Sequence, residues 1–265
     1  MLISVKSPQC LSTRLGTEAM LYLRSLIYTI LFIVTIVITS ALIVIFGAFN
    51  RRIGFKIGSL WGRAIIGFGA WFCGMRFEIE GTENIPQEPS VALMKHSSTW
   101  ETIAGLFFVP QHTWVLKREL MWIPIVGWAL YILNPIAINR SAGRSAVQQV
   151  LRQGRERLAS GLWIVIFPEG TRVAPGQTRR YGMSGVLLAK DTGAPLVPIA
   201  HNAGDCWPRR GLIKTPGLIR VVIGRPIPTE GRSPREVNAE AQNWIESTIA
   251  GFSETAPSGS QDLVS

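Results

Sequence analysis

The sequence predicts an α/β domain with a central mixed sheet flanked by helices, preceded by an N-terminal membrane-embedded helical segment or hairpin. Three observations lead to this prediction. Hydrophobic residues make up 47% of the chain, and the apolar excess is concentrated before residue 76. From residue 76 onward, short apolar runs typical of strands alternate with helical patterns, as expected of α/β proteins. A chain of 265 residues is long enough for one such domain and a membrane-associated extension.

The N-terminal part contains two apolar segments, at about residues 25–50 and 57–75. The first carries no charged residue and is long enough to cross the ~30 Å hydrocarbon core of a bilayer. A secretory signal would have a shorter apolar stretch and a small-residue cleavage site, whereas this segment ends in Arg51 and Arg52. The second segment either lies in the membrane interface or pairs with the first as a hairpin that enters one leaflet. We therefore expect residues 1–75 to be a retained membrane anchor.

Charge and cysteine content limit the location and the partners of the protein. Lys and Arg number 27 against 17 Asp and Glu, a net charge of +10, but the basic residues form no long cluster and no nucleic-acid motif is visible. Lipid head groups and phosphorylated substrates are therefore the expected anionic partners, and nucleic acid is not. Positive residues are slightly more frequent after the first apolar segment than before it, and the 3 cysteines have no C-x-x-C spacing. Both features favour a domain that faces the cytoplasm. We expect the membrane to be a bacterial inner membrane.

We expect the domain itself to span residues 76–252 and to be followed by a disordered tail at 253–265, which is small and polar. Two helices have clear end signals: Gly161 closes one, and Ser233-Pro234-Arg235-Glu236 opens the last with a capping box. Strands are predicted at residues 76–80, 90–94, 113–116, 135–138, 162–167, 195–200 and 219–223. Helices are predicted at residues 99–108, 141–160, 182–192 and 233–252.

The first chemical feature is His96, which stands five residues ahead of Glu101. In a continuous helix these side chains would point about 140° apart, so they meet only if the chain turns between them. A turn is expected, because residues 90–94 are predicted as a strand and Ser98-Thr99-Trp100-Glu101 has the form of a capping box. Glu101 could then fix one imidazole nitrogen and leave the other as a general base. The competing interpretation is a structural histidine, with Glu101 serving only as the capping partner of Ser98.

The second feature is Phe167-Pro168-Glu169-Gly170-Thr171-Arg172, which follows a predicted buried strand. Charged residues after a central strand project from its carboxyl edge, where ligands of α/β sheets bind. Arg172 could hold a phosphate, Gly170 allows close backbone approach, and Glu169 could orient the arginine or touch a substrate hydroxyl. Lys117 also follows a strand and is a candidate for the same phosphate. The alternative for the Phe167–Arg172 segment is an ordinary turn with a surface ion pair, and the alternative for Lys117 is a solvated cation at the end of a strand.

These segments stand in the order of the four motif blocks of the glycerolipid acyltransferase family. The matching residues are His96 with Glu101, Lys117 through Gly127, Phe167 through Arg172, and Leu196-Val197-Pro198-Ile199. The chain resembles that family over roughly residues 76–228. It departs from the family pattern at Glu101, where Asp is usual, and at Val173, where Ser is common.

The resemblance implies transfer of an acyl chain from acyl-CoA or acyl carrier protein to the free sn-2 hydroxyl of 1-acyl-glycerol-3-phosphate. This lysophosphatidate would become phosphatidate, at the lipid bilayer, with no cofactor and no metal. By the same resemblance, His96 is the base and Glu101 orients it, while Lys117 and Arg172 bind phosphate. The remaining assignments place Glu169, Gly170 and Thr171 in the acceptor site and Pro198 near the acyl donor.

A thioester is an activated donor, so we expect direct transfer without a covalent intermediate, and backbone N–H groups near His96 or Gly170 as oxyanion donors. A serine nucleophile at Ser97 or Ser98 is disfavoured, because Ser98 serves as the cap and residues 182–185 lack a G-x-S-x-G elbow. The alternatives are an acyltransferase for another lysolipid, a membrane-bound lipid esterase or thioesterase, and a noncatalytic lipid-binding module.

Overall fold

The computed structural model describes residues 8–254, with side chains from residue 17 to residue 252 except that of residue 140. All predicted strands form, with ends within two residues of the expected positions, and they join in one mixed 7-stranded sheet. The predicted α/β class is therefore confirmed. The strands are β1 (Met75–Glu80), β2 (Val91–Met94), β3 (His112–Lys117), β4 (Ile136–Ile138), β5 (Trp163–Ile166), β6 (Leu196–His201) and β7 (Gly217–Ile223).

The order of the strands is β1-β7-β6-β2-β5-β3-β4. From β6 to β4 all neighbouring strands are parallel, and only the β6–β7 pair is antiparallel. The carboxyl ends of β2, β3, β5 and β6 therefore lie at one edge of the sheet. That edge carries His96, Lys117 and the segment that contains Arg172, so the topology brings the predicted site residues to one side of the molecule.

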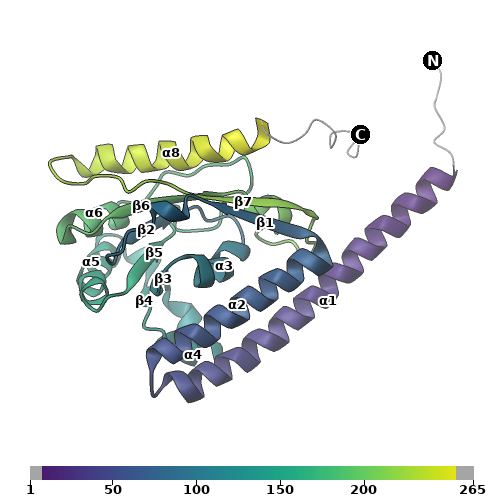
Figure 1. Ribbon diagram of the computed structural model, residues 1–265, viewed down its shortest axis with the longest axis horizontal. Coiled ribbons are helices and arrows are strands. Elements are labelled where there is room, and N and C mark those ends of the chain that lie inside the picture. Colours follow the sequence, from purple (N-terminus) through teal and green to yellow (C-terminus); the bar gives the residue numbers. More distant parts are fainter. Residues whose placement is uncertain (1–7, 255–265) are drawn as a thin grey trace.

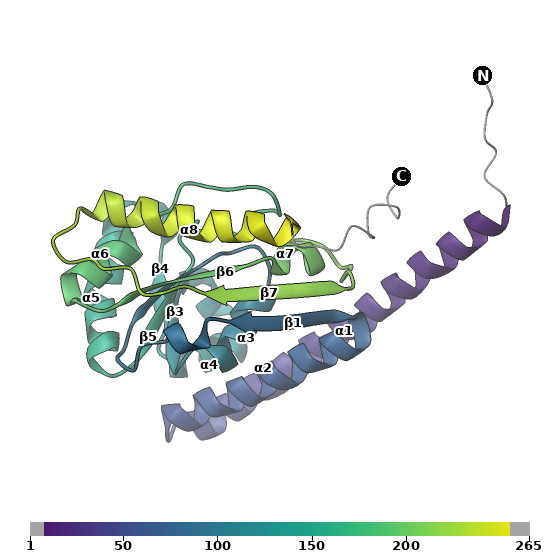
Figure 2. The ribbon, with the colours of Figure 1, turned by 45° about the horizontal axis from the view of Figure 1, so that its top comes forward.

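Side chains of the central strands alternate between two cores. In β2, Val91 and Leu93 belong to one core, and Ala92 and Met94 belong to the other. The first core is covered by α5 (Arg144–Ala159), α6 (Ser184–Thr192) and α8 (Pro234–Glu254), and the second by α2 (Arg51–Cys73) and α3 (Trp100–Phe108). Figure 2 shows these layers on opposite faces of the sheet. Both faces of the sheet are buried, which explains the continuous apolar runs of its central strands.

The predicted helices form with two differences. The helix expected at 141–160 begins only at Arg144, because Gly143 has a φ of 51° and separates it from a short turn, η3 (Arg140–Ala142). The last helix continues through Glu254, and the rest of the predicted disordered tail, 255–265, lies outside the described residues.

Four short elements were not predicted. They are η1 (Thr82–Asn84), η2 (Arg118–Trp122), α4 (Val126–Ile132) and α7 (Ala203–Cys206). In the sequence, Pro124 and Gly127 suggest a break in the chain at α4. The glycine is required there for another reason, since a Cβ atom would lie 2.2 Å from the carbonyl oxygen of Met121.

The N-terminal residues form a helical hairpin of α1 (Pro8–Gly47) and α2. Asn50 caps α2 by accepting a hydrogen bond from the backbone N–H of Arg52, so the helix begins before the apolar segment predicted at 57. Figure 1 shows α1 extending beyond α2 and the sheet. Among the described residues, α1 is the one helix that is long and apolar enough to cross a membrane, over Thr17–Gly47. Its outward side is apolar and exposed, which supports membrane association.

Candidate active site

His96 and Glu101 meet as the predicted turn requires. The imidazole Nδ1 lies 2.8 Å from the Oε1 atom of Glu101, which also accepts hydrogen bonds from the backbone N–H groups of Ser97 (3.1 Å) and Ser98 (3.0 Å). The hydroxyl of Ser98 accepts from the N–H of Trp100, where α3 begins. Glu101 therefore caps the helix and orients the imidazole at the same time.

The electrostatics of this pair favour an ionised carboxylate. Burial alone would raise the pKa of Glu101, but neighbouring His201 and the hydrogen bond with His96 hold it below its usual range. A carboxylate can only accept, so Nδ1 of His96 is the protonated ring nitrogen and Nε2 carries the lone pair. The ring also stacks on Phe167, with centroids 4.1 Å apart. This contact and Glu101 fix the orientation of the base.

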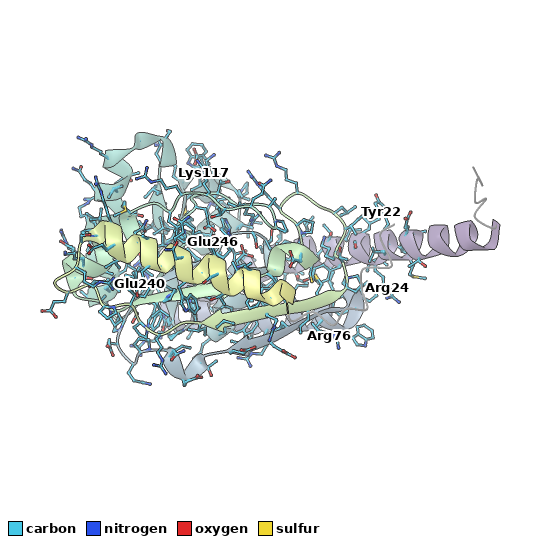
Figure 3. All side chains as sticks on the ribbon, turned by 90° about the horizontal axis from the view of Figure 1, so that it is seen from above. Tyr22, Arg24, Arg76, Lys117, Glu240 and Glu246 are labelled. Atoms are coloured by element: carbon cyan, nitrogen blue, oxygen red, sulfur yellow. The ribbon has the colours of Figure 1, made fainter. Side chains whose placement is uncertain are left out.

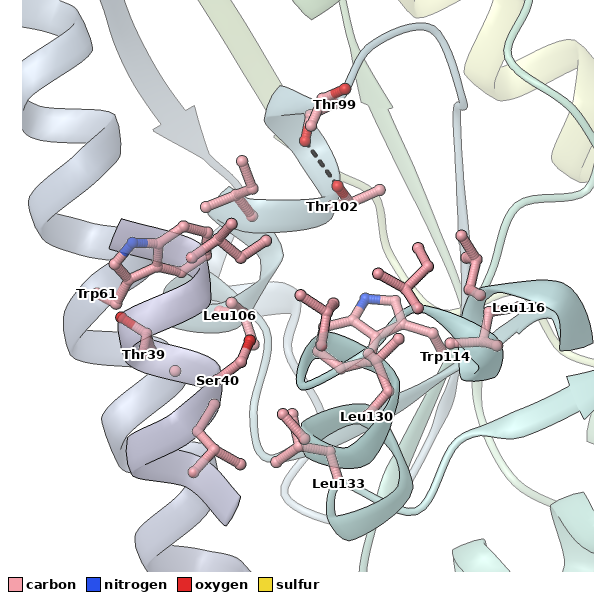
Figure 4. A pocket seen from close by; sticks show the side chains of 18 of the residues that line it. Thr39, Ser40, Trp61, Thr99, Thr102, Leu106, Trp114, Leu116, Leu130 and Leu133 are labelled. Atoms are coloured by element: carbon pink, nitrogen blue, oxygen red, sulfur yellow. Dashed lines mark hydrogen bonds between the residues drawn. The ribbon is translucent and has the colours of Figure 1, made fainter. Parts of the chain in front are cut away.

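His96 lines a cavity of about 370 Å³ between α1, α3, α4 and β3. Figure 4 shows its walls, with Trp61 and Leu106 on one side and Trp114 and Leu130 on the other. Most lining residues are apolar, and the polar ones are His96, Arg172, Thr39, Ser40, Thr99 and Thr102. An apolar cavity of this size with a few polar groups suits a lipid chain whose reacting group lies beside the base.

Arg172 is the one predicted substrate-binding residue that lines this cavity. Burial lowers the pKa of its guanidinium, and the charge of Glu101 acts in the opposite direction. An arginine stays protonated under such conditions, so a cation lies beside the imidazole. Among the described residues, no hydrogen-bond partner is found for its buried Nε atom. This guanidinium is suited to an anionic group of a substrate.

Lys117 lies at the same edge of the sheet but is not among the residues that line the cavity. Its side chain is 56% exposed and its Nζ atom lies 3.7 Å from Oε1 of Glu119. Lys117 is the last residue of β3 and is labelled in Figure 3. The structure therefore does not bring Lys117 together with Arg172 in one cavity.

Glu169 lies behind the His96 loop, outside the cavity where an acceptor contact was expected. Its Oε1 atom accepts from the backbone N–H of His96 at 3.2 Å and lies 3.7 Å from Nζ of Lys95. Burial raises the pKa of Glu169 to about 7. Gly170 makes the turn at a φ of 68°, and neither it nor Thr171 lines the cavity. The segment thus supports the base through Glu169 and presents Arg172 to the cavity.

Pro198 is buried inside β6, opposite Leu93 of β2, and is likewise not among the residues that line the cavity. Its carbonyl accepts from the N–H of Gly224 at 2.9 Å, just after β7 ends at Ile223. A proline is tolerated at the end of a ladder, where one hydrogen bond is missing. The structure therefore places Pro198 in the sheet, outside the cavity that His96 lines.

Four residues of this region, three of them buried, were missed in the sequence. Nζ of Lys95 lies 2.7 Å and 2.9 Å from the carboxylate oxygens of Glu246, on α8, and the hydroxyl of Tyr181 donates to the same carboxylate. Burial lowers the pKa of His201, and its Nε2 lies 2.7 Å from the carbonyl oxygen of Lys95. His201 follows a buried strand as His96 does, and this signal could have identified it. Glu246 gave no signal, because it lies 151 positions after Lys95.

The backbone N–H groups expected as oxyanion donors are engaged elsewhere. Those of His96, Ser97 and Ser98 donate to the two glutamates, and that of Gly170 donates to the carbonyl of Phe167 at 3.0 Å. Within residues 17–252, no group of three or more His, Cys, Asp or Glu side chains could hold a metal ion. The arrangement is one of a base, a carboxylate and a cation at a largely apolar cavity.

Comparisons with known proteins identify the family. Residues 76–202 match the Acyltransferase family model. The chain is 45% identical over 208 residues to the 1-acyl-sn-glycerol-3-phosphate acyltransferase of Pseudomonas aeruginosa, covering 77% of this chain and 80% of that protein. It is 28% identical to the sheep (Ovis aries) 1-acyl-sn-glycerol-3-phosphate acyltransferase alpha, covering 70% of this chain and 66% of that protein.

The fold has a solved counterpart in the 1-acyl-sn-glycerophosphate (LPA) acyltransferase PlsC of Thermotoga maritima. The two superpose with a TM-score of 0.74 at 21% identity, over 89% of this chain and 97% of that chain. The resemblance expected from the four motif segments is confirmed. This chain belongs to the glycerolipid acyltransferase family, among the 1-acyl-sn-glycerol-3-phosphate acyltransferases.

Proposed function

We propose that the protein transfers an acyl chain from acyl-CoA or acyl carrier protein to the sn-2 hydroxyl of 1-acyl-glycerol-3-phosphate, giving phosphatidate. One observation carries this proposal: His96, which is held by Glu101, and Arg172 line the same largely apolar cavity. A base acts on a hydroxyl, a cation binds a phosphate, and an apolar cavity holds an acyl chain. The relatives named above support the same reaction.

In the proposed mechanism, Nε2 of His96 takes the proton of the sn-2 hydroxyl as its oxygen attacks the thioester carbonyl. A C–O bond forms, the C–S bond breaks as the tetrahedral intermediate collapses, and the proton passes from the imidazolium to the leaving thiolate. Glu101 keeps Nδ1 protonated and stabilises the imidazolium. The donor brings its own activated carbonyl, so no covalent enzyme intermediate is required.

The positions of the two neighbouring serines support direct transfer. The hydroxyl of Ser97 accepts a hydrogen bond from the N–H of Gly204 at 3.1 Å, and that of Ser98 accepts from the N–H of Trp100. Neither serine is among the residues that line the cavity with His96. Both hydroxyls are used to hold the loop, which disfavours them as nucleophiles.

Among the remaining predicted residues, we propose that some act on the substrate and others support the structure of the site. Arg172 contacts the phosphate of the acceptor, and Lys117 acts on it from the rim as a distant charge. Gly170 and Thr171 shape the turn that carries Arg172. Glu169 is a positioning residue for the backbone of His96. Pro198 contributes to the sheet on which the loops stand.

The membrane geometry follows from the hairpin. The cavity is lined by α1 residues such as Phe32, Ile36 and Ile43, and other residues of the same helix, among them Ile30 and Ile38, are exposed and apolar. An acyl chain could therefore pass from the bilayer to His96 along α1. We propose that the hairpin anchors the domain at the cytoplasmic side of a bacterial inner membrane.

The deciding experiment supplies purified full-length protein with one labelled acyl-CoA, with and without lysophosphatidate. The proposal expects phosphatidate only when the acceptor is present. Release of fatty acid at full rate without the acceptor would identify a thioesterase, and lipid binding without turnover of any donor would identify a noncatalytic module. A panel of other lysolipids at equal concentration tests the choice of acceptor.

A further inference from the structure

A second arginine lies beside Arg172, on the loop that follows α7. The Nη1 atom of Arg209 donates a hydrogen bond to the backbone carbonyl of Arg172 at 2.9 Å. The charge of Arg209 acts together with burial to lower the pKa of Arg172. Arg209 is exposed and does not line the cavity, so it lies on the outer side of the segment that presents Arg172 to the cavity.

Among the described residues, no carboxylate lies within ion-pair distance of either arginine. Neither Arg172 nor Arg209 forms an ion pair there, and the buried Nε of Arg172 has no partner. The charge of Glu101 acts on Arg172, but its Oε1 atom is already bound by His96, Ser97 and Ser98. Neighbouring guanidinium groups without a counter-charge favour a bound anion, and a doubly charged one most.

The loop that carries Arg209 is anchored at its other end to the membrane hairpin. The backbone N–H of Lys214 donates to the hydroxyl of Ser25 on α1 at 2.9 Å, and its Nζ atom donates to the carbonyl of Leu212 at 2.8 Å and to Thr29. Lys214 is buried and lies over the ring of Trp207. The loop is therefore anchored at Lys214, and Arg209 itself is held by its hydrogen bond to Arg172.

We propose that Arg209 is a second ligand of the acceptor phosphate and selects phosphomonoester lysolipids over lysolipids with a neutral or esterified head group. The inference rests on the proposed function and deepens it. A phosphomonoester carries a charge of about −1.5 to −2 at neutral pH, which two guanidinium groups can match. A phosphodiester carries a single negative charge because a second phosphate oxygen is esterified, and a monoacylglycerol carries no charge.

The test compares steady-state kinetics of wild type and Arg209→Ala with lysophosphatidate and with its phosphate-free counterpart, monoacylglycerol. Arg210→Ala is the matched control, because Arg210 is the next residue along the chain and is exposed, as Arg209 is. In Arg209→Ala, KM for lysophosphatidate should rise about 10- to 100-fold, while KM for acyl-CoA and the rate with monoacylglycerol should stay within about twofold. Arg209→Lys should recover part of the loss, since it restores the charge but not the planar fork. Arg210→Ala should behave as wild type.

A purely structural role for Arg209 would lower the rates with both acceptors equally, and that result would overturn the proposal, as would an unchanged KM for lysophosphatidate. Binding of lysophosphatidate in detergent micelles, followed by tryptophan fluorescence, gives a readout that does not need turnover. Arg209→Ala should weaken it by the same factor. A wild type that binds lysophosphatidate tightly without acylating it would contradict the proposed function alone, whereas equal affinity for lysophosphatidate and monoacylglycerol would contradict the role of Arg209.

Discussion

The loop that follows β2 has two sides with different neighbours, a cavity on one side and the helices α7 and α8 on the other. On the cavity side, the imidazole of His96 lies near Arg172, whose Nε atom lacks a partner among the described residues. On the side that faces α8, Lys95 is held by Glu246, and Ser97 accepts a hydrogen bond from α7. Adjacent residues of one short loop thus serve different purposes. The contacts with α7 and α8 fix the backbone of the loop, so the other side can present Arg172 to a substrate in the cavity.

This comparison predicts that His96→Ala affects activity and leaves stability nearly unchanged. Loss of a general base should lower kcat by roughly 10²- to 10⁴-fold, which is the usual contribution of such a group. The fold should persist, because the ring faces a cavity. The rate of phosphatidate formation and the thermal midpoint in detergent measure the two effects. Ser97→Ala and Ser98→Ala are the controls and should retain acyl transfer, whereas an acyl group trapped on either serine would refute direct transfer.

Glu101 belongs to both sides, since its Oε1 atom binds the imidazole and two backbone N–H groups. Glu101→Gln should lower kcat by about 10²- to 10³-fold, because a neutral amide no longer stabilises the imidazolium or enforces its tautomer. Glu101→Asp carries the residue usual in the family and should retain much more activity. Equal losses in the two variants would mean that side-chain length matters and charge does not.

On the α8 side, Glu246→Gln should reduce stability more than it reduces kcat. The change removes the charge that compensates buried Lys95, and breaking such a pair is destabilising; we expect about 2 kcal/mol, because the Glu246 side chain is 24% exposed. The thermal midpoint should fall by roughly 4–8 °C. Lys95→Met combined with Glu246→Gln should recover part of this loss, as a double-mutant cycle would reveal. A loss of kcat as large as that of His96→Ala would end the distinction between the two sides.

Glu169 adds a pH dependence to the same side. Burial raises its pKa from 4.5 to about 7 in the folded protein. Between these values the folded state binds more protons than the unfolded state, so this contribution to stability is full below the unfolded pKa and is lost as pH rises through the folded one. The slope should reach at most about 1.4 kcal/mol per pH unit. The free energy of unfolding, measured from about pH 5 to about pH 8, should therefore depend less steeply on pH in Glu169→Gln than in wild type. Identical slopes in the two proteins would contradict the raised pKa of Glu169.

The sequence was sufficient to predict the sheet and the His96–Glu101 contact, because both depend on local patterns. Apolar runs of strand length mark each strand. The capping box that starts at Ser98 places a turn between His96 and Glu101, and only with such a turn can the two side chains meet. The α4 helix was missed because Gly127 reads as a break, although it is there to avoid a clash with Met121.

Other parts of the site depend on contacts between distant segments, which no single-sequence pattern records. Arg209 and Arg172 are 37 positions apart, and Lys95 and Glu246 are 151 apart. The motif residues Glu169 and Pro198 were identified by resemblance, but the side of the loop or sheet to which they belong is decided by packing. The motifs were therefore sufficient to locate the site, and the three-dimensional contacts were needed to show on which side of the loop or sheet each residue lies.

The smallest expected effect concerns Lys117, at the rim of the cavity side. Its side chain is 56% exposed and has Glu119 nearby, so water and salt screen its charge, and we expect about 0.2–1 kcal/mol from it. Lys117→Ala should thus raise KM for lysophosphatidate by no more than about fivefold, against about 10- to 100-fold for Arg172→Ala, with KM for acyl-CoA nearly unchanged in both. The effect of Lys117→Ala should disappear near 1 M salt, where the screening length is about 3 Å, while that of the partly buried Arg172 should persist. A salt-resistant loss in Lys117→Ala as large as that in Arg172→Ala would mean that η2 moves on substrate binding and brings Lys117 onto the phosphate.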